Sequence, residues 1–475
     1  MYDDDSGYLK SSSYTYSGRT FNTNYSYHPG GLPAMTIFGG SYGNVGYGYD
    51  SLARKQDTII LTAGQLNATL KNRLSYVSNG NAGTNLVSRA SIMTGTDITE
   101  DVTRQYVDYT YDSLGNITEQ VSYVNPDGLG FDAASQRFYY DNLNQLTRVD
   151  DQNLQQTIVY SYDNGGNIVS KRIYDYTTAQ SLEGKEVKQF ISYGYDTTWK
   201  DLLTFYKDGR IYYDSIGNPT QYYNSATFEW AKGRQLQRVQ LADGTYLSFR
   251  YNDEGVRTRK SVNGVETYFY LDGTNILAQK TGNDILWFNY DANGTRISIT
   301  MPNGAVYYYA YNAQGDVIGL YSVNQYGYFV PQVYYTYDAW GKVLSISGNM
   351  ADTLGQQNPF RYRGYYYDSE TQFYYLNSRY YDPEVGRFIN ADEQFNDDIL
   401  GNNIFIYCGN NPVNRSDYEG QGWWVVVSAA VGGILGGATK VVSNLMTGNQ
   451  WNEGVLGAMA GGFVAGTIMA TSGNL

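Results

Sequence analysis

Histidine and cysteine, which most often carry metal-binding and nucleophilic chemistry, are nearly absent from this sequence. There is one of each among 475 residues, His28 and Cys408. A single histidine cannot build a His-rich metal site and leaves no material for a Ser/His/Asp triad, and a single cysteine cannot form an intramolecular disulfide. His28 lies in a Tyr/Gly/Pro segment and Cys408 in an apolar one. We therefore interpret both as structural residues.

Acidic side chains recur at one position of a repeated phrase that runs along most of the chain. The phrase is aromatic-x-Tyr-Asp, two or three residues, Gly or Gly-Asn, and then Ile, Val or Leu, with clear copies at 109–117, 160–168 and 335–343. Between 253 and 312 this turn position is occupied by Asp253, Asp272, Asp291 and Asn312. One acid per turn supplies too few oxygens for Ca²⁺, which takes about 6–8 oxygen ligands, so we prefer turn capping to calcium binding.

The chemistry of the phrase predicts one β-hairpin per repeat. Residues i and i+2 of a strand share a face, so the two aromatics form one side of a ribbon. The Asp carboxylate can accept a backbone N–H two residues further on, Gly takes positive φ cheaply, and Ile or Val restarts the next strand. Stacked hairpins would bury aromatic ladders between neighbours.

Composition and charge agree with an all-β protein that does not bind nucleic acid. The chain has 52 Tyr, 17 Phe, 7 Trp and 53 Gly but only 9 Pro, which excludes disorder and collagen. With 33 basic and 46 acidic residues, the net charge of −13 provides no large basic surface for nucleic acid. No signal peptide is visible at the N-terminus. We expect either a signal-independent export route or a piece of a longer polypeptide.

The phrase is the YD repeat, and the chain resembles the Rhs/YD-repeat family of bacterial polymorphic toxins, wall-associated proteins and teneurins. The resemblance implies a β-hairpin ribbon spiralling as part of a hollow shell. It covers roughly residues 45–420. We assign residues 46–357 to this shell and set apart residues 1–45 as a poorly defined Tyr/Ser/Gly-rich segment.

Residues 358–420 resemble the Rhs repeat-associated core. The carrying motifs are Arg379-Tyr-Tyr-Asp-Pro-x-x-Gly-Arg-Phe, ending at Asp392, and a closing motif around Pro412 and Asp417. In the family this core is an aspartyl autoprotease that plugs the shell. By position, the resemblance implies that Asp392 and Asp417 are the acids and that Arg379 supports them. One acid would keep a proton and polarise the scissile carbonyl while the other activates water.

The resemblance places the cut one residue after the final Gly of the closing motif, between Gln421 and Gly422. This copy departs from the family, with Tyr418 in place of Pro and Gln421 in place of Leu or an aromatic residue. The alternative is structural: Asp392 and Asp417 cap turns, and Arg379 pairs with an acid of the wall.

Residues 421–475 change abruptly to Gly, Ala and Val and resemble a pre-toxin region. Small residues three to five apart predict a helical hairpin. The first apolar run, 423–438, is shorter than the roughly 20 residues of a membrane span. We therefore expect the tail to pack against protein, with membrane association of residues 423–470 as the alternative.

The sequence thus predicts the shell and core of an Rhs-type toxin that encloses a C-terminal cargo and frees it by self-cleavage, with the effector itself absent. Expected partners are that toxin cargo, its immunity protein and a secretion machinery, and the expected location is secreted or at the cell surface. No cofactor or metal is expected. The alternative is a surface adhesion module whose aromatic faces bind glycan or another cell.

Overall fold

The computed structural model of the chain is built almost entirely of antiparallel β-strands. It describes residues 7–16, 19–38, 43–62, 67–79, 82–96, 99–125, 130–392, 403–418, 420 and 424–425. In these residues each of the two large sheets pairs every strand with its neighbour in sequence. The predictions of an all-β fold and of one hairpin per repeat are confirmed.

The first sheet comprises β1 (Ser11–Tyr16), β2 (Arg19–Tyr27), β3 (Pro33–Phe38), β4 (Asn44–Tyr49), β5 (Lys55–Leu61), β6 (Thr69–Asn79), β7 (Ala82–Thr96), β8 (Thr99–Tyr111), β9 (Ile117–Val124), β10 (Asp132–Tyr140), β11 (Leu146–Asp151), β12 (Gln156–Tyr162), β13 (Ile168–Asp175), β14 (Gln189–Tyr195), β15 (Leu203–Tyr206) and β16 (Gly209–Arg210). The second comprises β17 (Tyr212–Tyr213), β18 (Pro219–Gln221), β19 (Thr227–Ala231), β20 (Gln235–Gln240), β21 (Tyr246–Tyr251), β22 (Arg257–Val262), β23 (Val265–Asp272), β24 (Asn275–Thr281), β25 (Asp284–Tyr290), β26 (Arg296–Thr300), β27 (Val306–Tyr311), β28 (Val317–Val323), β29 (Phe329–Tyr337) and β30 (Val343–Ser347).

The core consists of smaller elements. One sheet comprises β31 (Tyr366–Asp368), β32 (Phe373–Leu376), β33 (Arg379–Asp382) and β34 (Arg387–Phe388). In a second, β35 (Arg415–Ser416) of the core pairs with β36 (Trp424–Val425), which follows the core in the chain. A π-helical turn η1 (Ala351–Gly355) precedes it, and two 3₁₀ turns, η2 (Tyr362–Gly364) and η3 (Cys408–Asn410), lie within it.

The YD turn joins each strand to the next by a fixed set of bonds. In the copy at 111–117, the Asp112 carboxylate accepts the N–H groups of Leu114 at 2.9 Å and of Asn116 at 2.8 Å. Gly115 has a φ of 85°, where an L side chain would be strained. The Tyr111 hydroxyl donates to the carbonyl of Val87 in the previous hairpin. The register shifts between Thr110 and Tyr111, and such a bulge bends the ribbon.

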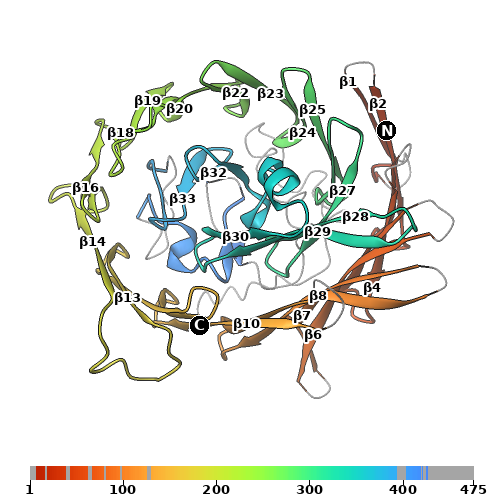
Figure 1. Ribbon diagram of the computed structural model, residues 1–475, viewed down its shortest axis with the longest axis horizontal. Helices are drawn as coiled ribbons and strands as arrows, with labels where there is room; N and C mark the ends of the chain where they lie inside the picture. The colour runs from red at the N-terminus through yellow and green to blue at the C-terminus, as the bar shows by residue number, and fades with distance from the viewer. Residues whose placement is uncertain are drawn as a thin grey trace, which may run out of the picture.

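The ribbon closes into a ring and then overlaps itself. Figure 1 shows the strands running around the ring, with β28 and β29 returning alongside β4–β8. Bonds join the two layers: the Gln136 amide donates to the carbonyl of Tyr337 at 3.3 Å, and the Asn72 amide donates to that of Tyr311 at 3.1 Å. A buried apolar cluster that includes Ile92 and Phe329 lies along the same seam.

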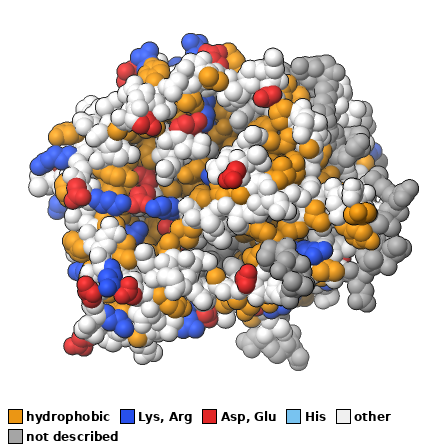
Figure 2. Space-filling view, in the orientation of Figure 1, with side chains coloured by type: hydrophobic (Ala, Val, Ile, Leu, Met, Phe, Trp, Pro, Cys, Tyr) orange, Lys and Arg blue, Asp and Glu red, His pale blue; other side chains and the backbone are white. Residues whose placement is uncertain are grey.

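The core lies inside the ring and shares its aromatic packing with the wall. Figure 1 shows β32 and β33 enclosed by the strands of the wall, and Figure 2 shows hydrophobic side chains gathered within the ring, with many charged ones near its margin. Tyr374, Tyr381 and Tyr407 are fully buried in the main apolar cluster, which also contains wall residues such as Phe249. The core is therefore packed against the wall as one body with it.

The two ends of the chain differ from the sequence-based prediction where the structure describes them. Strands β1–β3 fall within residues 1–45 and continue the first sheet without a break. Trp424–Val425, expected in a helix, form strand β36 because their backbone pairs with Arg415–Ser416. The rest of the predicted helical hairpin lies outside the described residues. The division of the chain into four segments stays a prediction.

Candidate functional site

Arg379 is the centre of the candidate site, because one buried guanidinium contacts two carboxylates. Its Nη2 atom lies 2.9 Å from Asp392 Oδ2 and 3.2 Å from Asp417 Oδ2. The separation of the two oxygens cannot exceed the sum of these distances. The structure thus brings together all three residues that the resemblance singled out. The structural alternative expected Arg379 to pair with an acid of the wall, whereas its two ion pairs here are with Asp392 and Asp417.

The remaining N–H groups of Arg379 hold the backbone around the acids. Nη1 donates to the carbonyl of Ile404 at 3.1 Å, and Nε donates to the carbonyl of Gly420. The ring centroid of Phe388 lies 3.5 Å from the guanidinium carbon, a cation–π contact. Burial lowers the pKa of Arg379, while the charges of Asp417 and Asp392 act in the opposite direction. A buried cation costs free energy unless it is paired, and here every contact stabilises the charge.

Asp417 is held by its backbone as well as by its side chain. Its N–H donates to the hydroxyl oxygen of Tyr365 at 2.8 Å, and that hydroxyl lies 3.2 Å from the hydroxyl of Tyr407. The ring of Tyr418, the departure from the family's Pro, packs edge-on against Tyr365 with centroids 6.0 Å apart. Tyr418 therefore contributes packing where a proline would contribute a backbone restraint.

Gly420 lies against the turn between β32 and β33, where no side chain fits. A Cβ at this position would lie 2.6 Å from Ser378 Oγ and 2.8 Å from the carbonyl oxygen of Leu376. Its φ of 70° also disfavours an L side chain. This close approach brings the Gly420 carbonyl within reach of Arg379. The predicted cleavage residues, Gln421 and Gly422, lie outside the described residues.

Asp392 is the more accessible of the two acids. Its side chain is 12% exposed and that of Asp417 is 3% exposed. The Asp392 N–H donates to the carbonyl of Ile404 at 2.9 Å, so Ile404 is bonded to both Arg379 and the Asp392 backbone. A solvent-reachable carboxylate beside a buried one is an arrangement in which the two acids can take different roles.

The closing segment, residues 403–418, carries Asp417 and is bound by the wall through asparagine side chains. Asn410 Nδ2 donates to Gln145 Oε1 at 2.8 Å, and Asn414 Oδ1 accepts the N–H of Ile117 at 2.7 Å. Both asparagines are buried. The turns of the wall therefore fix the strand that presents Asp417.

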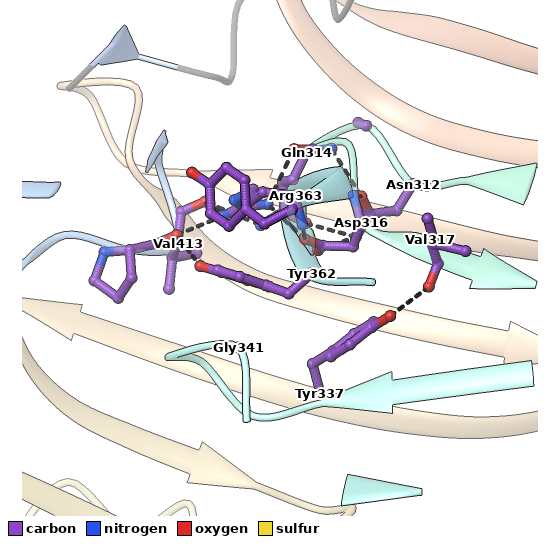
Figure 3. A network of polar contacts seen from close by, with 12 residues as sticks. Asn312, Gln314, Asp316, Val317, Tyr337, Gly341, Tyr362, Arg363 and Val413 are labelled. Carbon is purple, nitrogen blue, oxygen red and sulfur yellow. Dashed lines mark hydrogen bonds and ion pairs between the residues drawn. The ribbon is translucent and has the colours of Figure 1, made fainter. Parts of the chain in front are cut away.

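Arg363 fixes the same segment from the other side. Figure 3 shows its guanidinium between Asp316 of a YD turn and Val413. Nη1 lies 3.2 Å from Asp316 Oδ1, and Nη2 donates to the carbonyls of Pro412 and Val413, the latter at 3.2 Å. Burial opposes this charge, yet the neighbouring Asp316 carboxylate keeps the pKa of Arg363 above its usual value.

The sequence-based interpretation missed the residues that hold the acids, namely Tyr365, Phe388, Tyr407 and the closing-segment asparagines. Phe388 belongs to the conspicuous Gly-Arg-Phe motif, and that was its only signal.

His28 makes an edge contact with the ring of Tyr49, with centroids 5.9 Å apart. Cys408 is buried, and burial together with the nearby Asp417 raises the pKa of its thiol, which disfavours the nucleophilic thiolate.

Two negative findings apply to the described residues. Among them, no group of three or more His, Cys, Asp or Glu side chains is placed to hold a metal ion. Across the same ranges, no helix has the length and apolar character needed to cross a bilayer.

A spiral of tyrosine-rich hairpins, closed around a core that ends in an arginine-bridged acid pair, defines this protein as a YD-repeat shell. The sequence model of the Teneurin YD-shell family matches residues 92–413. The chain therefore belongs to that family.

Relatives and solved structures agree with this assignment. The chain is 33% identical over 298 residues to the tRNA3(Ser)-specific nuclease WapA of Bacillus spizizenii, covering 61% of this chain and 12% of that protein. It is 24% identical over 324 residues to Teneurin-4 of Mus musculus, covering 64% of this chain and 10% of that protein. It thus spans a small fraction of the relatives it matches.

Among solved structures, TcdB2-TccC3 without its hypervariable C-terminal region has the same fold, with a TM-score of 0.58 at 16% identity over 85% of this chain and 22% of that one. The Photorhabdus luminescens Tc holotoxin pore matches with a TM-score of 0.57 at 16% identity, over 87% and 22%.

Proposed function

We propose that this chain is the shell and core of an Rhs-type toxin, and that the core cuts its own backbone after the closing motif to free a C-terminal cargo. Asp392 and Asp417 are the acid/base pair, and Arg379 is the positioning residue. The observation that carries the proposal is that one guanidinium contacts both carboxylates and the carbonyl of Gly420. Gly420 immediately precedes the residue whose carbonyl would be attacked.

The proposed step is the hydrolysis of the peptide bond between Gln421 and Gly422. The ionised acid of the pair removes a proton from water, whose oxygen forms a bond to the carbonyl carbon of Gln421. The protonated acid gives its proton to the departing nitrogen of Gly422. The products are a new carboxylate at Gln421 and a new amine at Gly422. Arg379 offsets the repulsion between the two carboxylates and fixes the backbone before the cut.

Enclosure is the second part of the proposal. The wall surrounds the core, and the relatives that the chain matches include proteins named as nucleases and a mosquito salivary gland surface protein. We infer that this shell is exported to the cell surface or beyond and shields its cargo until the cut. The cargo, its immunity protein and the secretion machinery are partners of the whole polypeptide.

Self-cleavage is tested by translating the chain in a cell-free system and following a labelled pulse on gels. The wild type should convert to two fragments in a first-order process that is independent of protein concentration. Asp392→Asn and Asp417→Asn should each leave one intact chain, because either change removes a member of the acid/base pair. Arg379→Ala should slow the conversion. A wild-type chain that stays intact between pH 4 and pH 8 would refute the proposal.

A further inference from the structure

We propose that the wall gates the cut: the acid pair is assembled only when the closing segment is bound by two layers of the wall at once. This inference rests on the proposed function, since it names what regulates the same pair of acids. It goes beyond that function by assigning a checking role to wall residues far from the acids in sequence.

The first sheet, called the outer layer below, binds the closing segment through three successive YD turns. The four asparagines Asn403, Asn410, Asn411 and Asn414 are at most 3% exposed. The three turns are those that end at Asn116, Gln145 and Asn167. Asn403 Nδ2 donates to Asn167 Oδ1 at 2.8 Å, Asn410 Nδ2 to the carbonyl of Gly166 at 2.6 Å, Asn411 Nδ2 to Asn116 Oδ1 at 3.3 Å, and Asn414 Nδ2 to the hydroxyl of Tyr140 at 2.9 Å.

The second sheet, whose strands β28 and β29 form the overlapping layer, binds the same segment from the turn at 312–316, between β27 and β28. Gln314 Nε2 donates to the carbonyl of Val413 at 3.0 Å, and Asp316 holds Arg363, which donates to the same carbonyl at 3.2 Å. Figure 3 shows Gln314, Asp316 and Val413 around the Arg363 guanidinium. The closing segment is therefore held at Val413 by the turn at 312–316 and at Asn411 by the turn at 112–116. These turns lie about 200 residues apart in the chain and become neighbours only when the ring has closed, where the Ala313 N–H donates to the hydroxyl of Tyr109.

The closing segment has little regular structure to hold it without these bonds. Its only described elements are the short turn η3 and the two-residue strand β35. Ordering each residue of such a segment costs conformational entropy, which contacts must offset. Asp417 lies three residues after Asn414, so its place beside Arg379 follows from the bonds that precede it. A chain whose ring is still open lacks the bonds from the overlapping layer, and its acids stay apart.

The repeat itself supplies a matched control. Asn116, Asn167 and Asn218 occupy the same position of the YD turn, and each donates Nδ2 to the Asp that begins its own turn, at 3.0, 2.9 and 2.8 Å. Asn116 and Asn167 also accept an N–H from the closing segment. All three also donate Nδ2 to a neighbouring wall residue, which for Asn218 is the carbonyl of Gly233. Among the described residues, Asn218 Oδ1 accepts no hydrogen bond. Changing each to Ala removes the same turn bond, but only two of the changes remove a bond to the closing segment.

The test measures first-order rate constants of self-cleavage for Asn116→Ala, Asn167→Ala and Asn218→Ala in the pulse-labelled full chain. The first two should cleave about tenfold more slowly, the equivalent of one lost buried hydrogen bond, and Asn218→Ala should cleave at the wild-type rate. The slowing should be the same at every pH, because the acids are unchanged. Urea midpoints in the Asp417→Asn background should fall for all three variants, because each loses the bond to the Asp that begins its own turn.

The outcomes separate the gate from the function on which it rests. If the wild type cleaves and Asn116→Ala and Asn167→Ala match its rate, or if Asn218→Ala slows as much as they do, the gate is refuted and self-cleavage stands. If the wild type never cleaves while the Asp variants behave identically, the proposed function fails, and the gate fails with it.

Discussion

Replacing Gly420 with Ala should slow the cut strongly while leaving the wall intact. The new Cβ would lie 2.8 Å from the Leu376 carbonyl oxygen, a backbone atom that cannot turn aside, and 2.6 Å from Ser378 Oγ. The chain at 420 must therefore shift, and the bond from Arg379 Nε to the Gly420 carbonyl is lost. A hydrogen bond to a charged group contributes about 1.5–3 kcal/mol, so we expect self-cleavage to slow about 10- to 100-fold.

The matched control for this change is Gly244→Ala. Gly244 also has a positive φ, of 91°, but no atom lies within 4 Å of the Cβ that Ala would add. In both variants, placing an L side chain at positive φ costs roughly 1–2 kcal/mol of stability. Only Gly420→Ala adds the steric conflict. The assay is the pulse-labelled conversion of the full chain, with urea unfolding as the measure of the wall. Cleavage of Gly420→Ala at the rate of Gly244→Ala would show that the position of residue 420 does not matter.

Two further predictions concern the stability of the shell. Tyr162→Phe removes the hydroxyl that donates to the Leu146 carbonyl in the previous hairpin, and it should lower the free energy of unfolding by about 1 kcal/mol. The control, Tyr212→Phe, changes a side chain that is 53% exposed and should leave the free energy of unfolding unchanged. Equal effects of the two changes in urea titrations would contradict the role of the hydroxyl. Burial, followed by the charge of Glu384, raises the pKa of Asp382 to about 7. The folded state therefore binds that proton more tightly than the unfolded state, and stability should fall as the pH rises from about 4 through 7. Asp382→Asn should flatten this slope in urea midpoints measured at pH 5 and pH 8, and an unchanged slope would contradict the assignment.

The strands and turns could be predicted because the information that specifies them is local. Each phrase carries its own aromatic face, its capping Asp and its Gly with positive φ, and the bonds at Asp112 and Gly115 are those expected from the residue types. One available signal went unused. The first aromatic of the phrase is Tyr or Phe, as at Phe249 and Phe288, whereas the second is Tyr in the clear copies, as at Tyr251 and Tyr290. That bias reflects the hydroxyl, which bonds the preceding hairpin.

The overlap of the two layers could not be predicted, because every YD turn looks alike in sequence. Nothing in the phrase at 312–316 says that it will face β8 and the closing segment rather than solvent. The asparagines of the closing segment read as ordinary turn residues, and Asn410, with a φ of 59°, is indeed one. Their second role depends on wall turns more than 200 residues away, a register that only the closed ring defines.

The motif and the resemblance were sufficient to predict the acids of the candidate site. They did not predict the residues that hold those acids in place. Asp392, Asp417 and Arg379 stand in a long ordered motif, so their proximity could be expected. Tyr365 is one of 52 tyrosines, and nothing in its own surroundings in sequence sets it apart. Its bond to the Asp417 N–H depends on the fold of the core. Aromatic residues are too common here for composition to distinguish a ladder residue from a positioning residue.

The most direct test of the central claim is to let the chain cleave in heavy-oxygen water and determine the masses of both fragments. Attack by water activated by the acid pair places one heavy oxygen atom in the new carboxylate of Gln421, with Gly422 as the new N-terminal residue. The Asp417→Asn chain should show neither product. A cut at another bond, a new carboxylate without heavy oxygen, or the same two fragments from Asp417→Asn would contradict hydrolysis by Asp392 and Asp417.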